Sequence, residues 1–141
     1  MANFGDELRA APAQAAKEQE AKAKADQARR VAEFLAEQRA IVDDAVQYFK
    51  EQCHFAARDD KRSIDCKPDR HNVRGAVYIG NTLTSLLVGK SYARKRAQQL
   101  VPEVEKQLST LGLRSYRVSI IDVATTYPTR YYVGFRIQAS W

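Results

Sequence analysis

Residues 13–57 contain neither glycine nor proline, and this uninterrupted stretch limits the possible folds more than any other feature of the chain. Strong helix formers dominate it, and acid-first pairs four residues apart, such as Glu18 with Lys22, add small stabilising contributions. Pro12 fits the first turn of a helix, where its missing N–H is not needed. The sequence therefore predicts one long N-terminal helix.

The apolar pattern of this helix changes near residue 31. Downstream of that point, apolar side chains recur at helical spacing and form one stripe that should pack on the rest of the protein. The stripe consists of Val31, Phe34, Leu35, Ile41, Val42, Ala45, Val46, Phe49, Cys53 and Ala56. Residues 13–30 have no such stripe. We therefore expect a solvated Ala/Lys/Glu-rich helical arm at residues 1–30 and a compact α+β domain at residues 31–141, which includes the amphipathic part of the first helix.

The segment after the long helix leaves two interpretations open. Residues 59–72 are typical of a polar loop, and residues 76–79 predict a strand. Gly80 and Asn81 favour a tight turn into a second strand at residues 82–88. The alternative is a helix beginning at residue 81 or 82, since the leucines that follow also fit helical spacing. The threonines and Gly89 weigh against that helix.

The remaining elements are a second helix and two strands. Residues 91–111 place an apolar stripe on one face, and Gly112 is a suitable C-terminal stop. Residues 114–124 and 130–141 predict strands joined by a turn at residues 127–128. Apolar residues alternate along the last strand, so one face of the sheet should be buried. The expected fold is α+β: a long N-terminal helix, then a four-stranded antiparallel sheet in the order β-β-α-β-β, with helices packed on one face.

Composition bounds the class of protein. The chain is 45% hydrophobic and 28% charged, as in ordinary soluble domains. No apolar run approaches the length of about 18 residues that a membrane span needs. The N-terminal residues lack the features of a secretory signal. We therefore expect a cytoplasmic protein that does not insert into a membrane.

Charge is distributed unevenly and suggests an acidic partner. Residues 1–60 hold nine Lys/Arg against twelve Asp/Glu, whereas residues 61–141 hold fourteen against five. A basic compact domain favours nucleic acid or an acidic protein surface as its partner. The densest basic segment is KSYARKR at residues 90–96, with Lys90, Arg94, Lys95 and Arg96. At the start of the predicted second helix these cations oppose the helix dipole, so a binding role is the functional interpretation and a solvated turn the structural one.

The open face of the sheet is the second candidate site. Arg117 and Ser119 of one predicted strand should lie beside Tyr132, Arg136 and Gln138 of the next. Exposed tyrosine beside arginine is typical of surfaces that stack on nucleic-acid bases and equally of protein interfaces. The predicted partner-binding residues are therefore Lys90, Arg94, Lys95, Arg96, Arg117, Tyr132 and Arg136.

Metal and catalytic chemistry find little support. Cys53, His54, Cys66 and His71 do not match a common zinc-finger spacing, and Cys53 belongs to the core stripe. The aspartates of the polar loop alternate with Lys and Arg, as in a solvated loop. No phosphate-binding loop or nucleophile motif is present. We expect no metal, no cofactor and no enzymatic activity.

These features favour a non-enzymatic binding protein that engages nucleic acid or a nucleic-acid-handling complex. In architecture alone, the chain is similar to small accessory proteins of phages and mobile elements. That resemblance implies the alternative of a protein that binds and inhibits a host protein. A further alternative is self-assembly as a homo-oligomer, because small residues on the first helix follow the spacing of a close helix pair. They are Ala21, Ala25, Ala28, Ala32 and Leu35.

Overall fold

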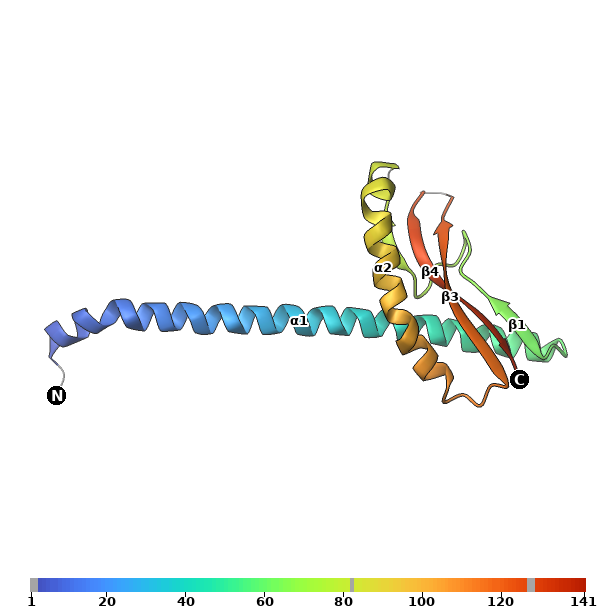
Figure 1. Cartoon of the computed structure of the whole chain (residues 1–141), viewed down its shortest axis with the longest axis horizontal. Coiled ribbons are helices and arrows are strands. Elements are labelled where there is room, and N and C mark those ends of the chain that lie inside the picture. The colour runs from blue at the N-terminus through green and yellow to red at the C-terminus, as the bar shows by residue number, and fades with distance from the viewer. Residues whose placement is uncertain (1–2, 82, 127–128) are drawn as a thin grey trace. The chain divides into compact units, whose positions relative to one another are not determined.

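The computed structural model describes residues 3–81, 83–126 and 129–141. Its elements are α1 (Phe4–Arg58), β1 (Ser63–Cys66), β2 (Val77–Gly80), α2 (Leu83–Leu108), β3 (Ser115–Ala124) and β4 (Tyr131–Ser140) (Figure 1). The predicted α+β class, the long first helix and the four-stranded antiparallel sheet are confirmed. The chain comprises two compact units, the N-terminal unit Met1–Glu37 and the body Gln38–Trp141. The predicted turn at residues 127–128 lies outside the described residues.

The N-terminal unit is helical from Phe4 onward. Asn3 caps this end, because its side-chain Oδ1 accepts the N–H of Asp6 at 2.9 Å. Asp6 also forms an ion pair with Arg9, 2.6 Å between oxygen and nitrogen. Pro12 therefore lies inside α1 and not in its first turn, which corrects the predicted start of the helix. A local cap that satisfies the first N–H groups is the reason the helix begins earlier.

Side chains in this unit remain in contact with solvent. None of the described residues 3–37 is buried. Val31, Phe34 and Leu35 keep exposed fractions of 51%, 42% and 57%. The upstream part of the predicted core stripe was therefore wrong, and the buried positions of α1 begin at Val42. Whether the functional boundary lies at residue 30, as the sequence predicts, stays a prediction.

Limited proteolysis tests that boundary. Trypsin should cut first at Lys17, Lys22, Lys24, Arg29 or Arg30, because a helix segment with no buried side chain opens locally at little cost. Mass spectrometry of a digestion time course should show a resistant fragment that begins after these sites. First cleavage within residues 90–96 would contradict the prediction.

β4 is the central strand of the sheet. β3 pairs along its whole length on one edge, with Ser115 opposite Ser140 and Ala124 opposite Tyr131. β1 and β2 share the other edge end to end: β1 pairs with the last residues of β4 and β2 with its first. Every described strand therefore finds its partner in β4.

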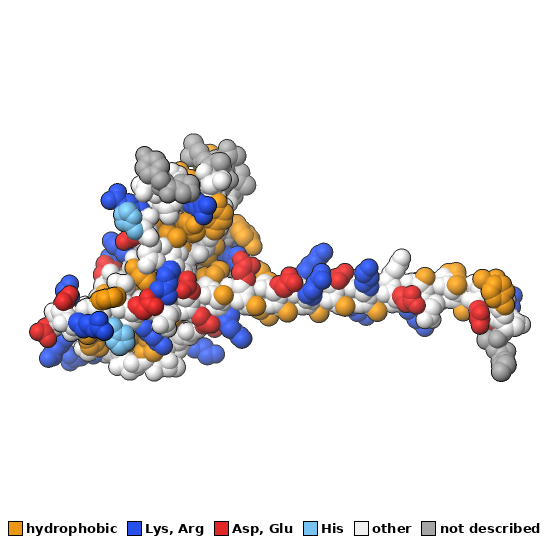
Figure 2. All heavy atoms as spheres, turned by 180° about the vertical axis from the view of Figure 1, so that it is seen from behind, with side chains coloured by type: hydrophobic (Ala, Val, Ile, Leu, Met, Phe, Trp, Pro, Cys, Tyr) orange, Lys and Arg blue, Asp and Glu red, His pale blue; other side chains and the backbone are white. Residues whose placement is uncertain are grey.

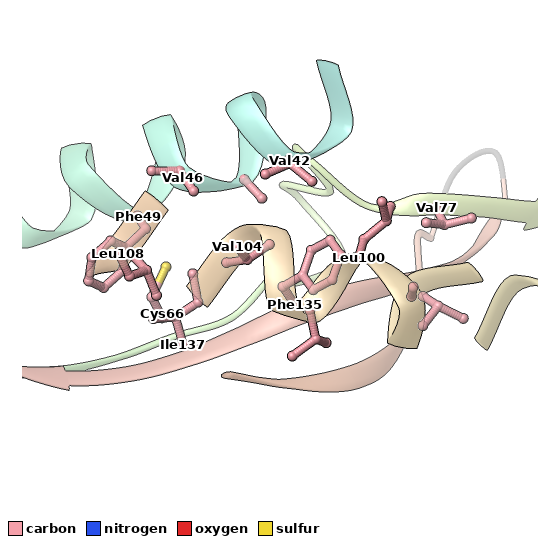
Figure 3. Close-up of a cluster of buried hydrophobic side chains, with 14 of the residues drawn as sticks. Val42, Val46, Phe49, Cys66, Val77, Leu100, Val104, Leu108, Phe135 and Ile137 are labelled. Atoms are coloured by element: carbon pink, nitrogen blue, oxygen red, sulfur yellow. The ribbon is translucent and has the colours of Figure 1, made fainter. Parts of the chain in front are cut away.

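One face of this sheet carries the core. The buried side chains of β4 on this face are Val133, Phe135, Ile137 and Ala139, and they join one hydrophobic cluster with buried side chains of both helices. Phe49 of α1 is 1% exposed, and Val104 and Leu108 of α2 are fully buried. Figure 3 shows these side chains converging between α1, α2 and β4. The alternating pattern of the last strand and the stripe of the second helix, both read from the sequence, are thus the core.

A loop at residues 67–76 bridges the gap between β1 and β2. At its start the ring of Pro68 packs on Gly134, where an added Cβ would lie 2.4 Å from the Pro68 Cγ. At its end Gly75 has a φ of +69° and sits against the backbone of Ala45 in α1. The two glycines therefore allow the loop to pass closely over β4 and α1.

The structure confirms the strand predicted at residues 76–79, which is β2, and corrects the strand predicted at residues 82–88 in favour of the alternative helix. Residues 83–88 belong to α2, so the predicted hairpin at residues 76–88 is not formed, and Thr82 lies outside the described residues. The predicted polar loop at residues 59–72 contains β1. Gly89 explains part of the error. Its missing Cβ lets α2 approach Ile79, whose Cγ2 would be 3.2 Å from a Cβ at this position.

Candidate binding surface

The basic segment at residues 90–96 lies within α2 and not at its start. Since α2 begins at Leu83, Lys90 follows two turns of helix. The effect of the helix dipole falls off within the first turn. The predicted electrostatic cost, which was the reason to single out this segment, is therefore largely absent.

Two cations of this segment are engaged by β3. Lys90 Nζ lies 3.1 Å from Asp122 Oδ2, and Arg94 Nε lies 3.2 Å from Asp122 Oδ1. Asp122 shares the helix-facing side of β3 with Val118 and Ile120. All three charged side chains are between a third and a half exposed, so the ion pairs contribute only modestly to stability. They nevertheless reduce the charge that Lys90 and Arg94 present to a partner.

The other two predicted cations of the segment differ in exposure. Lys95 is exposed, whereas Arg96 is half-buried. Lys95 is thus the exposed cation of this segment that forms no ion pair with a described residue. It is a weaker candidate site than the sequence indicated.

The opposite side of the sheet carries mostly polar side chains and, among the described residues, is covered by Pro68 only at Gly134; we call it the uncovered face. Strand register places the following residues on it: Ser63, Asp65, Tyr78, Ser115, Arg117, Ser119, Ile121, Val123, Tyr132, Arg136, Gln138 and Ser140. None of these side chains is buried. The structure therefore brings Arg117, Tyr132 and Arg136 together, as predicted, and leaves the four cations of α2 on the other side of the sheet.

Arg136 is held by a carboxylate on this face. Its Nε and one terminal nitrogen donate to the two oxygens of Asp65, at 2.9 and 2.6 Å. This bidentate hydrogen bond lowers the pKa of Asp65 below its ordinary value. The pair ties β1 to β4 and leaves Arg136 with less free charge.

Arg117 is the more available cation. It is exposed and lies opposite Gln138 in the β3–β4 ladder. Within the described part of the chain its side chain has no ion-pair partner. The hydroxyls of Ser115 and Ser140 are hydrogen-bonded at 2.6 Å nearby. This end of the face therefore combines a guanidinium group with several neutral hydrogen-bonding groups.

The other end of the face is aromatic. The rings of Tyr78 and Tyr132 are 5.3 Å apart between centroids and tilted by 57°. Tyr78 is 51% exposed. Ile121 and Val123 lie in the same end of the face, partly exposed. The face thus grades from polar and cationic to aromatic and apolar.

An ion-pair network that sequence patterns did not indicate fixes the loop at residues 67–76. Arg74 binds Asp44, with 3.1 Å between its Nε and Oδ1, and also Glu51 of α1. Its guanidinium carbon lies 5.7 Å from the ring centre of Tyr48. In the sequence, this network is marked only by an arginine next to a glycine, Arg74 and Gly75. Its partners lie 23 and 30 residues away, beyond local pattern analysis.

The two thiols are protonated at neutral pH. Burial raises the pKa of Cys53 to about 11 and that of Cys66 to about 12. Neither is therefore an activated nucleophile. Among the residues described, no three or more His, Cys, Asp or Glu side chains are grouped so that they could hold a metal ion.

Charges of both signs are mixed on the surface of the molecule. Figure 2 shows one face of the molecule on which Lys and Arg are interspersed with Asp and Glu, without a single large basic patch. The uncovered face of the sheet instead offers a guanidinium group, hydroxyls, an amide and tyrosine rings.

No helix in the described part of the chain is long and apolar enough to cross a lipid bilayer. Comparison with family models, curated proteins and solved structures finds no significant match to this chain.

Proposed function

We propose that the body, Gln38–Trp141, is a non-enzymatic binding unit that engages nucleic acid through the uncovered face of its sheet. One observation carries the proposal: an unburied sheet face that presents Arg117 and the Tyr78–Tyr132 pair belongs to a strongly basic unit. The body holds 17 Lys/Arg against 10 Asp/Glu. Such a charge excess attracts a polyanion without defining a sequence preference.

The chemistry of the face matches the parts of a nucleic-acid strand. Arg117 and the hydroxyl groups suit phosphate oxygens, and Tyr78 presents a half-exposed ring to an unstacked base. Base–aromatic stacking tolerates any base, because each base has a π-face. Single-stranded nucleic acid is therefore the expected form.

Fluorescence anisotropy with a labelled single-stranded oligonucleotide of mixed sequence tests this function. Arg117→Ala should make the dependence of log affinity on log salt shallower by about 0.7 for each phosphate that the arginine neutralises. Tyr78→Ala should weaken binding by about tenfold at every salt concentration, because the ring on which a base stacks is removed. Lys50→Ala is the matched control, since Lys50 is an exposed cation on α1 and outside the uncovered face. It should bind as the parent does.

Two results would contradict nucleic-acid binding through this face. One is equal affinity for Arg117→Ala, Tyr78→Ala and Lys50→Ala. The other is no detectable binding by the unaltered protein at low salt. Lys95→Ala completes the set, because an effect confined to this variant would move the site to α2.

An acidic protein surface is the second candidate partner. The specific observation is the aromatic and apolar end of the uncovered face, since tyrosine and arginine are enriched in protein interfaces. A protein partner should lose its affinity at one or two positions, Tyr78 first. A nucleic-acid partner should instead lose affinity gradually with each cation removed.

A further inference from the structure

A groove lies along the outer edge of β1, beside the C-terminal part of α1. Its volume is about 520 Å³. Tyr48, Phe55 and Ala56 of α1 contribute to one wall, and Ser63, Ile64 and Asp65 of β1 form the other. Helix and strand thus border an open space that has a strand edge on one side.

The edge of β1 that borders this groove has free backbone hydrogen-bonding groups. The N–H of Trp141 donates to the carbonyl of Arg62 at 3.0 Å. Arg62 and Trp141 are therefore a hydrogen-bonded pair, and every second pair along the β1–β4 ladder is hydrogen-bonded in the same way. By antiparallel alternation, Ile64 and Cys66 exchange hydrogen bonds with β4. The N–H and C=O groups of Ser63 and Asp65 therefore point away from β4, and no other described strand pairs with β1.

The helical wall of the groove combines the polar Gln52 with the apolar groups of Phe55 and Ala56. Phe55 is 60% exposed although it lies next to the buried Ala56. The guanidinium group of Arg58 lies over the Phe55 ring, 5.9 Å from its centre, at the end of the helix. A side chain that enters the groove beside Ile64 would cover the Phe55 ring and remove apolar area from water.

We propose that this groove binds an extended peptide segment of a partner protein, which adds to β1 as a further strand. The backbone of an extended peptide is the complement of the outward N–H and C=O groups of Ser63 and Asp65. Alternate side chains of the peptide point to the same side, so an apolar residue every second position meets Phe55 and Ile64.

The charges around the groove do not select a polyanion. Lys61 and Lys67 line it together with Asp59 and Asp69, and the charge of Asp65 is engaged by Arg136. A second folded copy is a poorer fit, because a four-residue edge is short for an interface in which each partner buries about 800 Å². A short linear peptide needs no larger area.

The first test uses a phage-displayed library of random linear peptides selected on the full chain. Enriched peptides should share apolar residues at alternate positions. Ser63→Pro removes the outward N–H and leaves the β4 ladder intact, so it should weaken binding of a selected peptide at least tenfold. Ser63→Ala removes only the hydroxyl and should bind as the parent does. Proton exchange measured by NMR should show the Ser63 and Asp65 amides protected when the peptide is bound.

A second variant keeps the test decisive if Ser63→Pro does not fold. Phe55→Ala should also weaken peptide binding at least tenfold, whereas Tyr92→Ala, which truncates a similarly exposed aromatic on α2, should not. Absence of any enriched peptide would overturn the proposal, as would selected peptides that bind Phe55→Ala like the parent. Arg117→Ala should keep peptide affinity, so this outcome is independent of nucleic-acid binding by the uncovered face.

Discussion

Replacing Gly75 by alanine is expected to destabilise the body by about 2–5 kcal/mol, the sum of backbone strain and overpacking. Gly75 has a φ of +69°, which costs a residue with a Cβ about 1–2 kcal/mol. A Cβ there would also lie 2.4 Å from the Ala45 nitrogen and 2.5 Å from its Cα. Both atoms belong to the α1 backbone and cannot move aside, so overpacking adds about 1–3 kcal/mol.

Gly75→Ala should also disturb the hydrogen bonds that hold the loop on α1. The N–H of Gly75 donates to Asp44 Oδ2 at 2.9 Å, and Asp44 in turn binds Arg74. Displacing Gly75 therefore loosens the ion-pair network that holds the loop on α1. Urea unfolding followed by circular dichroism should show a lower midpoint with an unchanged slope.

Gly112→Ala is the matched control. Gly112 has almost the same φ, +70°, but an added Cβ would find no atom within 4 Å. Its substitution should cost only the backbone strain, about 1–2 kcal/mol. Equal losses for the two alanine variants would show that the loop is not seated on α1.

The second large effect is expected for Phe49→Ala. Phe49 is 1% exposed and lies in the core cluster with residues of α2 and β4. Truncating a buried phenylalanine leaves a cavity and costs about 3–5 kcal/mol. This loss is a large part of the net stability of about 5–15 kcal/mol that is usual for a domain. Thermal unfolding should show a midpoint lower by about 10 °C or more, as roughly 4–8 °C per kcal/mol applies near 100 residues.

Leu35→Ala provides the comparison within the same helix. Leu35 is 57% exposed and belongs to the N-terminal unit. Its replacement should change stability by about 0.5 kcal/mol or less, as at other surface positions. A loss comparable to that of Phe49→Ala would restore the core stripe predicted from residue 31 onward.

Periodicity predicted which side of each helix is apolar but not how far along the helix the core extends. Val31 and Leu35 fit the stripe as well as Val42 and Phe49 do, yet only the latter are buried. Helical spacing describes an angle around the axis, and burial along the axis depends on where α2 and the sheet lie. For residues 93–108 of α2 and residues 133–139 of β4, the predicted apolar positions do lie in the core, and the same analysis succeeded there.

The strand errors have separate causes. β1 is only four residues long and contains Asp65, so it matched a polar loop. A signal was present, since apolar Ile64 and Cys66 alternate with polar neighbours. At residues 83–88 the leucines fit either structure. Gly80 with Asn81 favoured a hairpin, and tertiary packing on β2 favoured the helix.

For the candidate site, strand alternation was enough to group Arg117, Tyr132 and Arg136 on one face. It was not enough to find their counter-charges. Asp65 lies 71 residues from Arg136 in the chain, and a pairing at that distance depends on sheet topology. The same limit applies to Asp122, which engages two cations of α2.

The central position of β4 also orders events during synthesis. β1, β2 and β3 leave the ribosome before their common partner, and none of the described pairings joins them to one another. Until residues 131–140 emerge, the nascent chain can form its helices but has no sheet to cover them. A truncated chain that lacks β4 would have helices with an exposed apolar face. Such a product is expected to be a substrate for chaperones and proteases, so folding of the body waits for the emergence of β4.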